Sequence, residues 1–360
     1  MSGRERASDA LDIGRDRPHV EAMLPLSVLD LSFVRSGHPP SAALHETIAL
    51  AKTCDAAGYR RYWLAEHHNL PSVASPAPEI MIGQVAAATS RIRVGSGGVM
   101  LPNHSPLMVA ERFRVLEGLF PDRIDLGVGR APGTDGVTAY ALRRHQEGRE
   151  GDDFLEKLQE LILWETGGFP EGHPFRRVSA MPTDVKLPPI WLLGSSGYSA
   201  RLAAQVGMGF AFAHHFATHP VDDAMLTYKE AFQPSVWMDK PWSILAVAAV
   251  IGETAEEAER LASSQDLNRL KRDRGEFGPI PSPEEAAAYP YTEFERQTIR
   301  RNRDRLFVGT PDEVAKTLVA FADSARADEL MITSAIYDQP ARHRSYELLM
   351  EAVRRVSVTA

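Results

Sequence analysis

Short apolar runs of strand length alternate with amphipathic stretches of helix length along the chain from Leu24 onward. The helical stretches have the expected spacing, as in residues 44–54, where apolar side chains recur every three or four positions. The runs that we expect to form strands are residues 24–29, 62–65, 92–95, 124–129, 190–193, 209–212, 242–250 and 329–333. This alternation predicts a parallel sheet whose strands are connected by crossover helices.

The number and order of these elements favour an α/β fold, a (β/α)8 TIM barrel with rim insertions. An open, doubly wound sheet is the alternative, but such a sheet carries a glycine-rich turn after its first strand. Here the first strand runs instead into the sequence Asp30-Leu31-Ser32-Phe33. We therefore predict a closed barrel.

A chain of 360 residues can form a single barrel domain of this kind. We assign residues 23–360 to the barrel, with insertions over residues 131–189 and 270–305, where the regular alternation breaks. Residues 1–22 show no clean period and are expected to form a disordered leader. The second insertion is dominated by charge, proline and glycine, a composition that predicts a mobile loop able to act as a lid.

Charge and hydropathy argue against several classes of partner. The 48 acidic and 40 basic side chains give a net charge of −8, and no run of Lys or Arg is long enough to follow a nucleic-acid backbone. No apolar stretch approaches the roughly 20 residues that span a bilayer, and no signal peptide is recognisable, so we expect no membrane partner and a cytoplasmic location. The single cysteine, Cys54, excludes an internal disulfide and is expected in the core.

Polar residues follow three of the expected strands directly, and in a barrel the active site lies at these carboxyl ends. The turn Gly194-Ser195-Ser196-Gly197 precedes a helix that contains Ser199. Glycines allow backbone amides to approach a phosphate, while the serine hydroxyls and the helix amino end donate hydrogen bonds. Arg130, after the neighbouring strand, would add a charged fork for the same anion. The structural alternatives are that Ser196 or Ser199 merely caps the helix and that Arg130 forms a rim salt bridge.

Glu66, His67 and His68 follow the second strand, at a poor place for imidazoles that serve only as core filler. We expect His67, with Glu66, to have an acid–base or cofactor-facing role, and a hydrogen-bonded structural pair is the alternative. A metal site is not expected, because neighbours on an extended chain point to opposite sides and no supporting ligand pair follows. Of His214 and His215 after the sixth strand, we expect one to line the cleft and the other to face solvent.

Gly97 and Gly98 lie in a glycine-rich run that ends the third strand. Without a Cβ atom at these positions, an aromatic ring could lie against bare backbone. These two glycines are therefore further candidates for cofactor binding.

Taken together, these segments resemble the bacterial luciferase-like flavin monooxygenase family over residues 24–356. The matching motifs, in the family's order, are Trp63 to His68, Val94 to Pro102, Arg123 to Arg130, Leu193 to Gly197 and Val308 to Pro311. The resemblance implies FMN, delivered reduced by a separate flavin reductase, which with molecular oxygen would oxygenate a small organic substrate. A homodimer is also implied.

The same resemblance implies roles for individual residues. Arg130, Ser195, Ser196, Gly197 and Ser199 would bind the FMN phosphate. Gly97-Gly98 would form a non-proline cis peptide under the flavin ring, and His67 would match the luciferase histidine that acts as a base.

One departure and two alternatives bear on the function. Luciferase has a cysteine where this chain has Gly129, so the chain is more similar to the non-luminescent, single-chain members of the family. A deazaflavin cofactor that transfers hydride is one alternative. A non-catalytic flavin-binding protein is the other, against which the intact Glu66-His67-His68 motif argues. The substrate itself is beyond the sequence.

Overall fold

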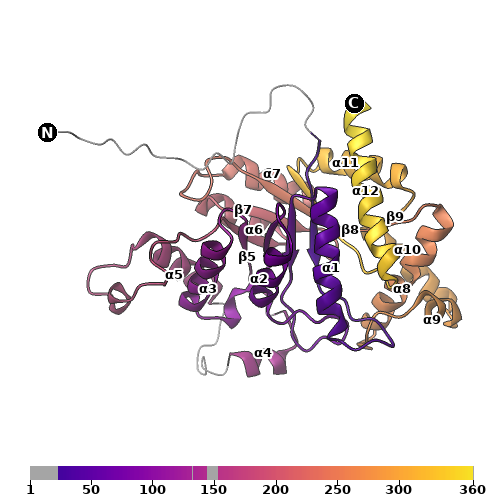
Figure 1. Ribbon diagram of the computed structural model, residues 1–360, viewed down its shortest axis with the longest axis horizontal. Coiled ribbons are helices and arrows are strands. Elements are labelled where there is room, and N and C mark those ends of the chain that lie inside the picture. The colour runs from indigo at the N-terminus through magenta and orange to yellow at the C-terminus, as the bar shows by residue number, and fades with distance from the viewer. Residues whose placement is uncertain (1–22, 132, 144–152, 360) are drawn as a thin grey trace.

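The computed structural model of the protein describes residues 23–131, 133–143 and 153–359, so the leader expected over residues 1–22 lies outside the described residues. Parallel strands form a closed barrel, which confirms the predicted (β/α)8 fold (Figure 1). The barrel strands are β1 (Leu26–Asp30), β2 (Arg61–Leu64), β3 (Arg93–Ser96), β5 (Ile124–Gly129), β6 (Ile190–Gly194), β7 (Gly209–Ala213), β8 (Ser243–Ile251) and β10 (Glu329–Thr333). The ring closes where Glu329 of β10 pairs with Ile244 of β8.

Helices that follow the strands form the outer layer of the barrel. They are α1 (Ala42–Ala57), α2 (Pro78–Ala88), α3 (Pro106–Leu119), α5 (Phe154–Thr166), α6 (Gly197–Val206), α7 (Val221–Ala231), α11 (Pro311–Ser324) and α12 (Gln339–Thr359). Cys54 of α1 is buried, as the sequence predicts. Among the described residues, no helix is both long and apolar enough to span a membrane.

Further elements lie at the carboxyl ends of the barrel strands. The strand β4 (Val99–Met100) pairs with the end of β5, and β9 (Leu306–Gly309) pairs with the end of β8. The 3₁₀ helix η1 (Leu101–Asn103) follows β4, and α4 (Gly136–Leu142) lies in the segment 131–189. The same segment contains η3 (Pro174–Arg177), which instead packs beside the last turn of α5, where Phe175 stacks on Trp164.

The prediction of a loop over residues 270–305 is wrong, because much of this segment is helical. It follows α8 (Ala255–Arg272) and contains α9 (Pro283–Ala288), α10 (Glu293–Asn302) and η4 (Arg303–Arg305), grouped on the side of the molecule opposite α3 and α5 (Figure 1). Ser282 and Thr292 each begin a helix with a full capping box. Some of its charges are also paired within the segment, as in the Arg274–Glu295 ion pair. Composition alone does not reveal such pairing.

Alternate strand residues point into the barrel and form an apolar cluster separate from the one between sheet and helices. The interior cluster is dominated by Trp63 and Trp191, whose rings meet edge to face with centroids 5.5 Å apart. Towards the carboxyl ends of the strands the inward positions become small. They are Gly97, Gly129, Ala213, Ala248 and Thr333.

The amino ends of the strands enclose a buried network of charges around Arg61. Its Nε donates to Glu329 Oε1 at 2.9 Å, and its Nη1 donates to Asp125 Oδ2 at 2.8 Å. Arg93 also donates to Asp125, and Ser27 donates to Glu329. Burial raises the pKa of Asp125, but the attraction of Arg61 and Arg93 outweighs burial and holds this pKa below its ordinary value. The network therefore joins β1, β2, β3, β5 and β10 at one end of the barrel.

Arg61→Met should destabilise the protein strongly, because it leaves two buried carboxylates without their central cation. We expect the free energy of unfolding, measured by urea denaturation, to fall by about 3–5 kcal/mol. Arg300→Met removes an exposed arginine paired with Glu293 and should leave that free energy nearly unchanged. Similar effects of the two substitutions would contradict the structural role of Arg61.

Candidate functional site

Glu66 is fully buried directly after β2 and anchors the loop that follows β3. The Nε2 atoms of His68 and His104 lie 2.8 and 2.9 Å from its Oε1, and the Met100 amide donates to its Oε2 at 2.8 Å. Burial raises the pKa of Glu66, but these hydrogen bonds outweigh burial and hold the pKa below its ordinary value. The carboxylate is thus ionised and its hydrogen-bonding capacity is largely used.

His67 occupies the next inward position after Trp63 and Ala65. Its backbone N–H donates to Ser75, whereas its side-chain Nδ1 is buried and has no hydrogen-bond partner. Burial lowers the pKa of His67, and Arg272 and His68 contribute to the same shift against the opposing effect of Glu66. The imidazole is therefore neutral at neutral pH and presents a free ring nitrogen.

The β6–α6 turn presents unsatisfied hydrogen-bonding groups at the carboxyl end of β6. Ser196 holds the N-cap position of α6, but its side chain makes no capping hydrogen bond. Within the described part of the chain, no hydrogen bond involves the hydroxyls of Ser195, Ser196 or Ser199. The helix-capping alternative is thus not what the structure shows. Gly194 is required here because a Cβ atom would collide with the Ser199 side chain.

Arg130 follows β5 and lies beside this turn. Its Cζ is 5.0 Å from the ring centroid of Tyr198, which is in the first turn of α6. Two strand ends that are 65 positions apart in the sequence, at Gly129 and Gly194, thus bring a cation next to the amino end of a helix.

The peptide bond between Gly97 and Gly98 is cis, as the family resemblance implies. Both glycines also pack closely against the barrel wall. A Cβ atom at Gly97 would lie 2.6 Å from Leu29 Cδ1, and one at Gly98 would lie 2.8 Å from the Gly127 carbonyl oxygen. The barrel thus has its own structural need for glycine at these positions.

The two histidines after β7 differ from the sequence-based expectation. His215 Nδ1 lies 3.2 Å from the Ala246 carbonyl oxygen, and burial lowers the pKa of His215 to about 4. His214 packs edge-on against Phe321 of α11, with centroids 4.8 Å apart, where we expected one of the pair to face solvent.

Sequence reasoning missed two residues of this region. His104 completes the Glu66 network, although it lies 38 positions further along the chain. Thr333 ends β10 at an inward position, and its hydroxyl is buried without a hydrogen-bond partner. The alternation of β10 could have revealed Thr333, whereas nothing local to His104 indicates its partner.

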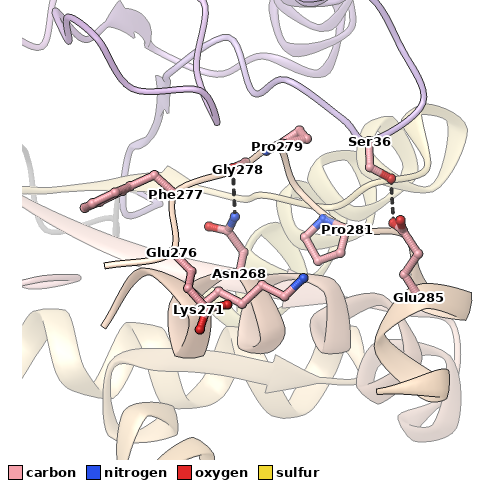
Figure 2. A pocket seen from close by; sticks show the side chains of 9 residues that line it. All are labelled: Ser36, Asn268, Lys271, Glu276, Phe277, Gly278, Pro279, Pro281 and Glu285. Carbon is pink, nitrogen blue, oxygen red and sulfur yellow. Dashed lines mark hydrogen bonds between the residues drawn. The ribbon is translucent and has the colours of Figure 1, made fainter. Parts of the chain in front are cut away.

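A hollow of about 380 Å³ opens beside α8 (Figure 2). It is bounded by α8, the segment 276–281 and the loop that carries Ser36. Figure 2 shows Asn268 and Lys271 of α8 among the side chains that line it. None of the site residues expected from the sequence lines this hollow.

Known proteins similar to this chain include several monooxygenases. A luciferase-like monooxygenase from Escherichia coli K12 is 40% identical over 91% of this chain and 96% of its own length. The N-acetyl-S-alkylcysteine monooxygenase of Bacillus subtilis 168 is 34% identical over 92% of this chain and 98% of its own. The oxygenase component of a flavin-dependent trigonelline monooxygenase from Acinetobacter baylyi is 23% identical over 77% and 79%.

Solved structures give the same picture of the fold. Apo-MsnO8 superposes with a TM-score of 0.81 at 38% identity, covering 92% of this chain and 98% of its own. At the level of fold alone, the oxygenating constituent of 3,6-diketocamphane monooxygenase from Pseudomonas putida, solved with FMN, has a TM-score of 0.67 at 19% identity and covers 92% and 97%. An F420-dependent secondary alcohol dehydrogenase has a TM-score of 0.64 at 13% identity and covers 92% and 100%.

The family model described as luciferase-like monooxygenase matches residues 24–328, most of the chain. The match includes the Glu66 network, Gly97-Gly98, Arg130 and the β6–α6 turn. The chain therefore belongs to the luciferase-like monooxygenase family.

Proposed function

We propose that the protein is an FMN-dependent monooxygenase that uses reduced flavin from a separate reductase and molecular oxygen to oxygenate a small organic substrate. The observation that carries this proposal is the uncapped amino end of α6, with three serine hydroxyls that lack partners and Arg130 beside it. Membership of a family of flavin enzymes supports the choice of cofactor.

The residues at the β6–α6 turn fit a phosphate group. The first amides of a helix lack intrahelical partners, and the helix dipole favours an anion at this end. Ser195, Ser196 and Ser199 would donate further hydrogen bonds, while Arg130 would add a charge-assisted one. Gly197 is exposed, and without a side chain its backbone amide would be open to the phosphate.

The small inward residues at the carboxyl ends of the strands would allow a flat ring to approach the barrel backbone near Gly97-Gly98. Bound reduced FMN would supply the electrons that activate oxygen for transfer of one oxygen atom to the substrate. His67, neutral and with a free Nδ1, would accept or return a proton beside the ring. Glu66 would act as a positioning residue, because its hydrogen bonds fix the strand end that carries His67.

Other parts of this proposal rest on the family. A relative and a structural neighbour are each the oxygenating component of a larger system, which supports a separate reductase. We further propose a cytoplasmic homodimer, and a thioether such as an N-acetyl-S-alkylcysteine as the first substrate to test, after the B. subtilis relative. A deazaflavin remains the alternative cofactor because an F420-dependent enzyme shares the fold.

The cofactor assignment predicts that the protein binds FMN with a Kd below about 100 μM and binds F420 more weakly. Arg130→Ala should weaken FMN binding by about 2 kcal/mol, since one charge-assisted hydrogen bond to the phosphate is lost. Riboflavin, which has no phosphate, should bind equally to both proteins. Quenching of flavin fluorescence measures each affinity.

Arg201→Ala is the matched control, because Arg201 is an exposed arginine on the same helix α6. It should leave both FMN and riboflavin affinities unchanged. Equal losses for FMN and riboflavin in Arg130→Ala would show that Arg130 does not contact the phosphate. Tighter binding of F420 than of FMN would overturn the proposed cofactor.

His67→Ala should retain FMN affinity and abolish substrate oxygenation in a reductase-coupled assay, because the proton acceptor is removed. The lowered pKa of His67 keeps the ring neutral as pH falls to 6.5, so wild-type kcat/KM should decline only below the ordinary histidine value of about 6.5. His219→Ala removes an exposed histidine and should change neither property. Unchanged turnover in His67→Ala, or an acid limb centred above 6.5, would reject this role.

A further inference from the structure

Helix α8 lies across the carboxyl ends of the last barrel strands. Its Leu261 and Ala262 pack in one apolar cluster with Ala248 and Val250 of β8 and with Ile336, which follows β10. The buried face of α8 therefore points to the same end of the barrel as the strand-end residues described above.

The same side of α8 becomes polar further along the helix. This side carries Gln265, Arg269 and Arg272, which are four and three positions apart. They therefore lie on one face of the helix, and this face continues from Leu261. The Nε atom of Arg269 and the Oε1 atom of Gln265 are buried without a hydrogen-bond partner. Unsatisfied buried polar atoms are uncommon in proteins and often mark the place of a ligand.

These arginines also lack an acidic partner within the protein. Among the described residues, no carboxylate oxygen lies within 4 Å of the side-chain nitrogens of Arg269, Arg272 or Arg305. Nearby acids are already engaged: Asp266 pairs with Arg303 at 2.7 Å, and Asp273 accepts a hydrogen bond from Asn302 at 3.2 Å. The face formed by Gln265, Arg269 and Arg272, which we call the α8 arginine face, thus carries positive charge without an ion pair among the described residues, and Asp273 and Asp266 act on Arg269 only at longer range.

The α8 arginine face lies within electrostatic range of the strand-end histidines. Burial is the largest cause of the low pKa of His67, and Arg272 adds to it. Burial likewise dominates for His215, where Arg269 contributes to the lowering. Arg272 therefore acts electrostatically on the residue that we propose to move protons, and Arg269 acts on His215.

We infer that the α8 arginine face binds the carboxylate of the substrate, so that the enzyme acts on small organic acids. This inference rests on the proposed function, because the acid would be the molecule that is oxygenated. A carboxylate can accept two parallel hydrogen bonds from one guanidinium, and a partly buried position strengthens such a pair. The Gln265 and Arg269 atoms that lack partners would be satisfied by the substrate or by the water that accompanies it.

The test compares linear and aryl carboxylic acids of four to ten carbons with their primary amides, which have nearly the same shape and no charge. Binding to the FMN-loaded protein is measured by isothermal titration calorimetry and saturation-transfer NMR. We expect each acid that binds to have an affinity at least about tenfold higher than that of its amide, because only the acid forms a hydrogen bond as a charged group. The double variant Arg269→Gln/Arg272→Gln should lose this preference.

Two control variants remove one positive charge each from other faces of α8. Arg260→Gln changes an exposed arginine of the same helix, and Lys271→Gln changes the lysine of the hollow in Figure 2. Both should keep the preference for acids. If Lys271→Gln removes it and the double variant does not, the anion binds in the hollow and the inference is wrong.

Three other results would overturn the inference. The first is that acids and amides bind with equal affinity, and the second is that neither binds at concentrations up to about 10 mM. The third is that the double variant binds FMN more weakly but binds riboflavin as before. The last result would mean that the α8 arginine face holds the flavin phosphate. Absence of FMN binding in the wild type would instead reject the proposed function, and the comparison of acids with amides would then be made on the flavin-free protein.

Discussion

The buried charge network around Arg61 is the constraint on which the barrel depends. One guanidinium holds Asp125 and Glu329, whose carboxylates come from strands on opposite sides of β2 in the order of the barrel. Arg61 also lies over the Trp191 ring, with Cζ 4.6 Å from the centroid, so the charges are covered by the aromatic layer above them. Two buried carboxylates are tolerable only with such partners, so the closed barrel depends on this network.

Because the charge network occupies the amino ends of the strands, the carboxyl ends are available for a functional site. Above the Trp63 and Trp191 layer the inward side chains are small, and the polar groups that lack partners gather there. His67 Nδ1 and the Thr333 hydroxyl are buried but unsatisfied, whereas most polar groups at the opposite end are paired. This division follows the general logic of barrel enzymes, in which stability and chemistry occupy opposite faces.

Sequence reasoning succeeded where the signal is local and periodic. Alternating apolar runs located the barrel strands, and the turn at Ser195 and Ser196 was visible because its residues are adjacent in the chain. The cis peptide at Gly97-Gly98 came from the family resemblance and not from periodicity. Strand β9 was missed because Leu306–Gly309 follows a charged stretch and pairs with the end of β8, outside the eight strands that close the barrel.

Contacts between distant residues explain the remaining differences. The helices of residues 270–305 depend on capping boxes and ion pairs that a count of charges cannot show. The partner of Glu66 in the loop after β3 could not be identified, because His104 has no periodic relation to it. The α8 arginine face was likewise hidden, since Arg269 and Arg272 stand in a charged stretch and the sequence does not show which of its charges form ion pairs.

A crystal structure of the protein with FMN would test the central claim most directly, because it locates the phosphate. The account predicts phosphate oxygens about 2.7–3.1 Å from the first amides of α6 and from a serine hydroxyl of the β6–α6 turn, with Arg130 on the same anion. A phosphate bound elsewhere, for instance at Arg269 and Arg272 on α8, would contradict it.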